Sequence, residues 1–460
     1  MSCRCAVLAF LALIPAFGRA TTYRVPDDFA TIQPAIDACG IGDTVLVGPG
    51  TYSGVGNTLL DFHGIDLVLR STAGSTQTII DGEGVSRGIN LENGETLASR
   101  VEGFTVQNCY YNGGTGPGGG MRCAYASATL DDMVFRDNWD DTGGGGISFA
   151  FGELVISRSR FEANIGRING GGLCVAGGAA LLIDVVFESN ISNWGGGIYA
   201  RYVSADTPTS LTLERVTFIG NRAVHNGGGL DASLWHSSLS IRHCAFIENT
   251  TDEGHGGGAL IHNEATGSIE QTVFQGNWAD SEGGGLSIQN RSHITLDHVD
   301  FIGNGAYSGC GGLNVYFYCE VALTQCTLYG NRTMNDHGGG VYVASSPITM
   351  DRCIVAFSEG AGFYGTGPVT LELNCCDVYG NSAGDYTGTA ADQAGISGTF
   401  SADPQFCGIP DSGNFLLQSD SPCAPGQHDC EAYIGSKPVG CGHIATEKST
   451  ISVPESTSGA

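Results

Sequence analysis

Histidines and carboxylates of the kind that move protons stand at recurring places in this sequence. His255 and Glu282 each directly precede a glycine triplet and are 27 residues apart, whereas His262 and Asp231 closely follow such triplets. If residues about 27 apart stack in neighbouring layers of a sheet, the first two lie ~5 Å apart, which suits a proton-relay pair or a weak cation site, for instance for calcium. We take these four residues as candidate catalytic groups, and no other cofactor is indicated. The alternative is that they are solvated turn residues.

A second set of side chains has the composition of a surface that stacks against sugars. Outward aromatic rings beside amide, acid and guanidinium groups suit the binding of a glycan. The candidates on the strand after each glycine triplet are Tyr199, Arg201, Gln289, Tyr316 and Tyr342, with Arg122 and Asp231 expected to point outward in the same strip. The alternative is ordinary decoration of a flat sheet. No metal ligands are assigned, because Asp131-Asp132 and Asp140-Asp141 are interpreted as turn residues.

An internal repeat must position these residues. An apolar residue, two variable residues and Asn recur at intervals of 23 to 31 residues. The Asn column contains Asn108, Asn138, Asn164, Asn190, Asn221, Asn249, Asn277, Asn304, Asn331, Ser358 and Asn381. About six residues later, three glycines introduce an alternating stretch such as Leu286-Ser287-Ile288, which is typical of a half-buried strand. Two further alternating stretches complete each repeat, so each repeat is interpreted as one coil of three short strands.

Stacking of such coils at ~4.8 Å predicts three parallel sheets around one apolar column. The recurring Asn is expected to adopt the left-handed backbone and to bond through its amide to the Asn of the coils above and below. Asn190, Asn249 and Asn331 lie in formal N-glycosylation sequons and are therefore expected to be unmodified. The glycine triplets are expected to supply positive φ and a close backbone approach at another corner.

The cysteines fall into two groups. Cys244, Cys326, Cys353 and Cys376 all precede the Asn position by five residues, in a column otherwise filled by apolar residues, so they are predicted to point inward and to stay reduced. Cys407, Cys423, Cys430 and Cys441 follow the last repeat in a segment without strand pattern. Two disulfides are predicted there, with their pairing left open.

The chain divides into five predicted segments. Residues 1–20 have the charge and apolar pattern of a secretory signal with cleavage near Ala20, and no later stretch is apolar and long enough to span a bilayer. Residues 21–41 are predicted to contain a short helix, capped by Thr31 and burying Ile32, Ala35 and Ile36, that covers the column. The solenoid is assigned to 42–385, with its first strand from Asp43 to Val47, a C-terminal cap to 386–445 and a disordered tail to 446–460.

Charge narrows the range of partners. Forty-seven acidic and 20 basic residues give a net charge of −27, which disfavours binding to nucleic acid or to an anionic membrane surface. Seventy-two glycines together with 41% hydrophobic residues indicate recurring turns in a packed fold rather than a disordered tract.

Two resemblances support the solenoid. Thr31-Ile32-Gln33, Gly42-Asp43-Thr44-Val45 and Pro49-Gly50-Thr51-Tyr52 resemble the N-terminal signature of right-handed β-helix proteins of the pectin-lyase-like superfamily. The paired Gly-Gly-x-apolar and Phe-x-x-Asn motifs are similar to the repeats of chlamydial polymorphic outer membrane proteins, which are adhesins, although Gly stands here where Ala is usual. Together they cover about residues 25 to 385. They imply an all-β fold, a single right-handed parallel β-helix with a capping helix and a disulfide-rich C-terminal cap.

These observations lead to two functional hypotheses. The first is a secreted or cell-surface scaffold for binding or adhesion, whose partner is an extracellular glycan or a surface protein. The second, which the superfamily resemblance implies, is a polysaccharide lyase or glycoside hydrolase that acts on acidic polysaccharide.

Overall fold

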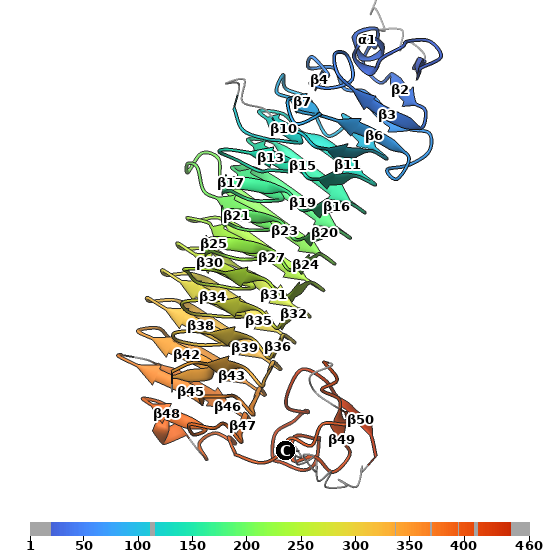
Figure 1. Ribbon diagram of the computed structural model, residues 1–460. Helices are drawn as coiled ribbons and strands as arrows, with labels where there is room; N and C mark the ends of the chain where they lie inside the picture. The colour runs from blue at the N-terminus through green and yellow to red at the C-terminus, as the bar shows by residue number, and fades with distance from the viewer. Residues whose placement is uncertain are drawn as a thin grey trace, which may run out of the picture.

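The computed structural model describes residues 20–110, 116–335, 337–368, 370–393, 395–408 and 413–442. The described chain is a parallel β-helix, an elongated stack of coils (Figure 1). Its helical elements in these ranges are α1 (Ile32–Asp37) and a 3-10 turn, η1 (Ala391–Gln393). No helix in the described part is both long and apolar enough to cross a membrane. The predicted signal, residues 1–20, lies almost wholly outside the described residues, and the predicted tail, 446–460, lies entirely outside them.

Three long parallel sheets run along the stack, as predicted. Sheet 1 has 14 strands: β1 (Thr22–Val25), β2 (Thr44–Val47), β5 (Val68–Ser71), β8 (Arg100–Glu102), β11 (Ala128–Asp131), β15 (Glu153–Ser157), β19 (Gly178–Ile183), β23 (Thr209–Glu214), β27 (Ser238–Arg242), β31 (Thr266–Glu270), β35 (His293–Asp297), β39 (Glu320–Thr324), β43 (Ile348–Asp351) and β46 (Leu371–Asn374).

Sheet 2 contains the strands that follow the glycine triplets. Its 13 strands are β4 (Leu60–Asp61), β7 (Ile89–Leu91), β10 (Met121–Ala124), β14 (Ile147–Ala150), β18 (Leu173–Ala176), β22 (Ile198–Arg201), β26 (Leu230–Ser233), β30 (Ala259–His262), β34 (Leu286–Gln289), β38 (Leu313–Tyr316), β42 (Gly338–Ala344), β45 (Ala361–Thr366) and β48 (Tyr386–Gly388).

Sheet 3 contains the Phe column. Its 13 strands are β3 (Gly50–Ser53), β6 (Thr78–Asp81), β9 (Thr105–Gln107), β12 (Val134–Arg136), β16 (Arg160–Glu162), β20 (Val186–Glu188), β24 (Thr217–Ile219), β28 (Ala245–Ile247), β32 (Val273–Gln275), β36 (Asp300–Ile302), β40 (Thr327–Tyr329), β44 (Ile354–Ala356) and β47 (Asp377–Tyr379).

A fourth sheet was not predicted. Sheet 4 has eight short strands that directly follow the Asn column: β13 (Trp139–Asp140), β17 (Ile165–Asn169), β21 (Ile191–Trp194), β25 (Arg222–Asn226), β29 (Thr250–Thr251), β33 (Trp278–Ala279), β37 (Gly305–Ala306) and β41 (Arg332–Thr333). Several of these strands have only two residues, too few to show an alternating pattern, so the sequence marked them as turn. Two further strands, β49 (Leu417–Gln418) and β50 (Val439–Cys441), pair with each other near the C-terminus.

The core is one continuous column. Seven phenylalanines stack ring on ring with centroids 4.6–5.1 Å apart: Phe135, Phe161, Phe187, Phe218, Phe246, Phe274 and Phe301. All seven are fully buried, and burial of each contributes about 1.5–3 kcal/mol relative to exposure. The predicted stacking of equivalent residues is thus confirmed.

The asparagine ladder is also present. From Asn138 to Asn331 each Asn donates through Nδ2 to the Oδ1 of the next one at 2.9–3.0 Å. The left-handed backbone, however, belongs to the residue before the Asn, for example Ala163 with φ 50° and Ser189 with φ 55°. The prediction that Asn itself adopts it is wrong from Asn138 onward, because the turn residue must bend the chain while the Asn side chain stays directed at its neighbours. Asn108 does have φ 49°, but its assignment to the Asn column is wrong: Cys109 occupies the ladder position there, and its amide donates to Asn138 Oδ1 at 3.0 Å.

The glycine triplets behave as predicted. The first glycine often has positive φ, as Gly227 does at 62°. A Cβ on Gly228 would lie 2.3 Å from the Gly257 carbonyl oxygen of the next coil, and a Cβ on Gly229 would lie 3.0 Å from the ring of Phe246. The triplet therefore marks a close approach of successive backbones.

The N-terminal region differs in two details from the prediction. Strand β1 precedes α1 and starts sheet 1, so Asp43–Val47 is not the first strand. The Thr31 side chain makes no capping hydrogen bond; instead the Ile32 amide donates to Asn57 Oδ1 at 3.2 Å. Ile32, Ala35 and Ile36 are buried, as expected.

The predicted set of disulfide-bonded cysteines needs one correction. Cys244, Cys326, Cys353 and Cys376 are buried and reduced, as predicted. The two disulfides join Cys407 to Cys441 and Cys375 to Cys430. Cys423, expected in a disulfide, is free, and its buried thiol donates to Asp377 Oδ2 at 3.2 Å. Cys375 takes its place because it follows β46 and points away from the column that Cys376 enters.

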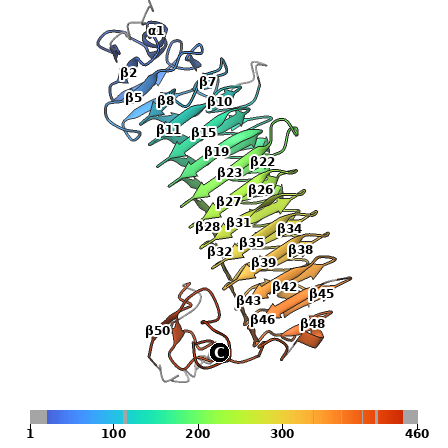
Figure 2. The same cartoon turned by 180° about the vertical axis from the view of Figure 1, so that it is seen from behind.

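The disulfide-tied segment, residues 403–408 and 413–442, lies beside the last coils (Figures 1 and 2). Ile354 and Ala356 of β44 pack against Leu417 and Ile434 of the segment, which covers the outer face of sheet 3. An ion pair adds to this, from Lys437 to the buried Asp300 at 3.3 Å. The segment thus covers a flank of the stack through contacts far apart in sequence.

Candidate functional site on the outer face of sheet 2

Four of the candidate residues, Asp231, His262, Gln289 and Tyr316, lie on four neighbouring strands, β26, β30, β34 and β38. These strands are paired in register, Asp231 with Leu260 and Ser233 with His262, so outward side chains form rows across the coils. Inward positions such as Leu230 and Ile261 belong to the core. Alternation along each strand therefore directs the candidate polar groups to one face.

Asp231 and His262 form a hydrogen-bonded pair. His262 Nε2 lies 2.9 Å from Asp231 Oδ1, and the Asp231 side chain is 1% exposed. Asp231 leaves the sheet on the outer side, as predicted, but neighbouring side chains cover it, so it does not present itself to solvent. A buried carboxylate fixes the orientation of the imidazole that is hydrogen-bonded to it.

His255 and Glu282 lie next to this pair. His255 Nδ1 is 3.7 Å from Glu282 Oε2, too far for a hydrogen bond, and Nδ1 has no partner among the described residues. Burial lowers the pKa of His255; the Glu282 carboxylate opposes this shift, and His262 adds to it. The structure thus brings together all four candidate catalytic residues, with one imidazole biased towards its neutral form.

The predicted glycan-contact residues are more scattered. Tyr199 pairs across strands with Asp231 and is mostly buried; burial, and then the Asp231 charge, raise its pKa. Gln289 points outward, as predicted, but it is buried, and its amide donates to Ser287 Oγ at 3.0 Å. Side chains from the loops that precede the glycine triplets cover these strands, which alternation cannot reveal.

The remaining predicted residues lie at either end of this region. The Tyr316 ring lies 4.0 Å from that of Phe317, centroid to centroid. Tyr342 stacks on Tyr364 with centroids 5.7 Å apart, and burial raises its pKa to about 12. Arg201 lies on β22, apart from the others and exposed.

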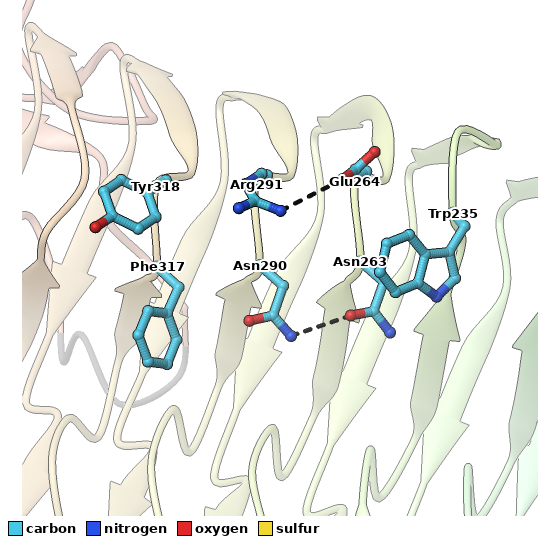
Figure 3. A pocket seen from close by; sticks show the side chains of 7 residues that line it. All are labelled: Trp235, Asn263, Glu264, Asn290, Arg291, Phe317 and Tyr318. Atoms are coloured by element: carbon cyan, nitrogen blue, oxygen red, sulfur yellow. Dashed lines mark hydrogen bonds and ion pairs between the residues drawn. The ribbon is translucent and has the colours of Figure 1, made fainter.

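A hollow at the end of these strands was not predicted. We call it the corner hollow; it has a volume of about 320 Å³ and is lined by Trp235, Asn263, Glu264, Asn290, Arg291, Phe317 and Tyr318 (Figure 3). These residues follow the C-terminal ends of β26, β30, β34 and β38, so the corner hollow begins at the residue after His262. The sequence signal was present as paired polar or aromatic residues at one repeat position.

The corner hollow combines aromatic and polar groups. Asn290 Nδ2 donates to Asn263 Oδ1 at 3.0 Å, and Arg291 lies 3.7 Å from Glu264. Figure 3 shows Trp235 on one side of these four residues and Phe317 with Tyr318 on the other. The three rings are 42%, 45% and 64% exposed, respectively.

The backbone of the corner hollow is strained. Six of its residues have left-handed φ between 56° and 65°: Asn263, Glu264, Asn290, Arg291, Phe317 and Tyr318. Asn tolerates this conformation, but for an aromatic residue it costs about 1–2 kcal/mol. Single left-handed residues occur at corners along the whole stack, for example Ala163 and Ser189, whereas here two consecutive non-glycine residues adopt this conformation in each of three successive coils.

Within the described residues, no three His, Cys, Asp or Glu side chains gather closely enough to hold a metal ion. The calcium site considered from the sequence therefore stays a prediction that rests on His255 and Glu282 with other donors.

Comparisons with known proteins agree with the fold. Residues 232–400 match the family model of the right handed beta helix region, and residues 184–201 match the Chlamydia polymorphic membrane protein repeat. The chain is thus a parallel β-helix protein that resembles polymorphic membrane proteins, as the sequence motifs predicted. A search of curated protein sequences found no significant match.

Solved structures of the same kind are distant. The catalytic unit of a GH87 alpha-1,3-glucanase from Streptomyces thermodiastaticus is 13% identical, covers 81% of this chain and 69% of its own, and has a TM-score of 0.47. A PL6 alginate lyase in complex with a trisaccharide is 10% identical; the match covers 92% of this chain and 93% of the lyase, with a TM-score of 0.44. PfbA, a surface adhesin of Streptococcus pneumoniae, is 13% identical; the match covers 80% of this chain and 93% of PfbA, with a TM-score of 0.40. At these values the similarities carry no argument about activity.

Proposed function

We propose that this protein is an extracellular or surface-exposed scaffold that binds a glycan through the corner hollow. The observation that supports this most is the pair of aromatic walls, Trp235 on one side and Phe317 with Tyr318 on the other. The hydrogen-bonded amides of Asn263 and Asn290 lie between them. Rings stack on the apolar faces of sugars, and amides bond to their hydroxyl groups. Three coil spacings separate Trp235 from Phe317, about 14 Å, which suits a short oligosaccharide.

The size and order of the corner hollow fit this role. Its volume of about 320 Å³ lies at the lower end of ligand sites. The hydrogen bond between Asn263 and Asn290 and the left-handed turns hold the side chains in place before a ligand arrives, which limits the entropy lost on binding. Secretion by a signal at 1–20 is part of the proposal, as is a surface location like that of the proteins whose repeat it resembles.

A glycan array tests this function. The purified protein is expected to bind a restricted set of glycans, and Trp235→Ala and Phe317→Ala are each expected to weaken binding about tenfold or more, as loss of a stacking ring does at binding hot spots. Trp139→Ala, which removes a similarly exposed ring from β13, is the matched control and is expected to leave binding unchanged. Absence of any bound glycan, or an equal loss in the control, would refute the proposal.

One observation favours a second function. The Asp231–His262 pair and the nearby His255 and Glu282 contain groups that can act as acid and base in cleavage of a polysaccharide. Turnover on a panel of polyuronides, measured with and without calcium and abolished by His255→Ala and His262→Ala, would establish an enzyme and replace the scaffold hypothesis.

A further inference from the structure

A second hollow lies on sheet 2 four coils nearer the N-terminus, across β10, β14, β18 and β22. We call it the alanine trough. Its volume is about 210 Å³. It shares no residue with the corner hollow, and the inference below does not depend on the proposed function.

Strand register explains the shape of the alanine trough. Ala124, Ala150 and Ala176 stand side by side in successive strands, and the next residue in that row is Arg201. Three methyl groups leave a floor without long side chains, and the Arg201 guanidinium closes the trough at one end. In the later coils the same row contains His262, Gln289 and Tyr316, whose bulk fills the equivalent space.

The two sides of the alanine trough differ in chemistry. On one side the rings of Tyr125 and Phe151 stack with centroids 4.7 Å apart. On the other side are Thr142 and Asn169, whose amide donates to the Thr142 carbonyl oxygen at 2.9 Å. One apolar wall and one hydrogen-bonding wall suit a ring that has an apolar face and a polar edge, as a sugar does.

Arg201 provides the positive charge of the alanine trough. Among the described residues it forms no ion pair, unlike Arg215 and Arg222, which bond to acidic side chains. Arg136 and Arg332 also have no ion pair among the described residues, but Arg136 donates to Gln107 Oε1 at 2.8 Å and Arg332 lies over the Trp278 ring. The Cys174 thiol beside it supplies no counter-charge, because burial raises the pKa of Cys174 to about 12.

The other charges around the trough are already compensated. Arg122, at the opposite end, donates through Nε to Glu92 at 2.9 Å. Asp140 lies behind the polar wall and accepts hydrogen bonds from the amides of Gly118 at 2.8 Å and Thr142 at 2.7 Å. Arg201 is therefore the group in the trough whose charge stays available.

We propose that the alanine trough binds a saccharide ring that bears one oxyanion group, a carboxylate or a sulfate, with the oxyanion on Arg201 and the ring over the alanine floor. A planar guanidinium bonds to such groups through two parallel N–H donors. The volume of about 210 Å³ is below that of sites for drug-sized ligands and fits a single substituted ring.

The test compares three monosaccharides, glucuronate, glucose 6-sulfate and glucose, by ligand-observed NMR titration of the full chain. At least one of the two acidic sugars is expected to bind at millimolar concentration, about tenfold or more tighter than glucose. The acidic sugar that binds identifies carboxylate or sulfate as the group recognised. Equal binding of glucose, or no binding of either acidic sugar, would overturn the proposal.

Three variants locate the site. Arg201→Gln is expected to abolish the preference for the acidic sugar, whereas Arg242→Gln, which removes the same charge from an exposed arginine of β27 paired with Glu270, is expected to keep it. Ala150→Leu fills the floor without changing charge and is expected to weaken binding of all three sugars. If Arg242→Gln acts as strongly as Arg201→Gln, the effect is one of net charge and the site is refuted. Trp235→Ala is expected to have no effect here, which separates this result from that for the corner hollow.

Discussion

Asn221 and Asn249 are 28 residues apart in the chain, yet the Asn221 Nδ2 donates to Asn249 Oδ1 at 2.9 Å. Asn221 uses its whole amide: Nδ2 also donates to the Phe187 carbonyl oxygen, and Oδ1 accepts from the Asn190 amide nitrogens of backbone and side chain. Every group is buried. Because each bond polarises the next, such a ladder stabilises the turn of several coils together.

Asn221→Ala is therefore expected to lower the free energy of unfolding by about 3 kcal/mol or more, because several buried polar groups lose their partners. Urea denaturation followed by circular dichroism measures this. Asn169→Ala is the control, since its amide makes one bond, to Thr142, at the surface, and a loss below about 1 kcal/mol is expected. Equal losses in the two variants would contradict a ladder that matters for stability.

The ladder also predicts a pattern of N-glycosylation. Asn190, Asn249 and Asn331 lie in sequons but are fully buried, whereas Asn290, in the sequon Asn290-Arg291-Ser292, lies at the corner hollow. Folded protein secreted from a glycosylating host is expected to be modified at Asn290 alone, and this modification is expected to block the corner hollow. Peptide mass spectrometry reads the sites, and a glycan on any of the three ladder residues in folded protein would contradict the prediction.

The sequence predicted what depends on the period of the repeat. Phe246 and Phe274 stack, and Cys244 points inward, because a residue one coil away must lie above or below its equivalent. What the period cannot show is which loop covers an outward side chain. Asp231 and Gln289 leave the sheet on the expected side and are nevertheless buried.

Contacts between segments far apart in sequence were equally hidden. The bond between Cys375 and Cys430 depends on where the C-terminal segment packs, and Cys375 lies before the segment in which the disulfides were predicted. The corner hollow depends on left-handed φ at Asn263 and Asn290, which sets the direction of their side chains. Neither feature follows from alternation of apolar residues.

Gly284, which is crowded, and Gly303, which is not, allow the cost of close packing to be measured apart from the cost of a left-handed backbone. A Cβ on Gly284 would lie 2.2 Å from the Gly305 carbonyl oxygen, whereas Gly303 has φ 58° and open space around it. Gly284→Ala is expected to cost about 3 kcal/mol or more through overpacking, and Gly303→Ala about 1 kcal/mol through the left-handed backbone. Urea unfolding of both variants tests this, and the reverse order would show that the coils are not in close contact at the triplet.

Stability is expected to depend on pH through Asp377, which lies between the stack and the C-terminal segment. Burial raises the pKa of Asp377 to about 7 from its ordinary 3.8, so the folded chain holds the proton more tightly than the unfolded chain. The contribution of this group is fully present below pH 3.8 and is lost as pH rises to about 7. A decrease of a few kcal/mol in the free energy of unfolding follows.

Asp377→Asn is expected to flatten this dependence, measured by urea unfolding and by proteolysis of the C-terminal segment at pH 5 and pH 8. Asp184→Asn is the control: the hydrogen bond from Arg215 lowers the pKa of Asp184, so its contribution is lost only as pH falls through the acid range. A pH profile that Asp377→Asn leaves unchanged would show that another group titrates.

The strained turn of the corner hollow predicts that stability and binding change in opposite directions. Tyr318 has φ 59° and is 64% exposed, so its ring contributes little to the core while its Cβ strains the backbone. Tyr318→Gly removes the strain and is expected to raise the free energy of unfolding by up to about 1 kcal/mol, while glycan binding at the corner hollow weakens.

Tyr318→Ala separates the two effects, because it removes the ring but keeps the Cβ at the left-handed position. It is expected to weaken glycan binding as much as Tyr318→Gly does, with no gain in stability. Urea unfolding and glycan-array binding of both variants give the comparison. If the glycine variant is no more stable than the alanine variant, the turn is not strained. If both variants bind as the unchanged protein does, the ring is held there for another reason than the ligand.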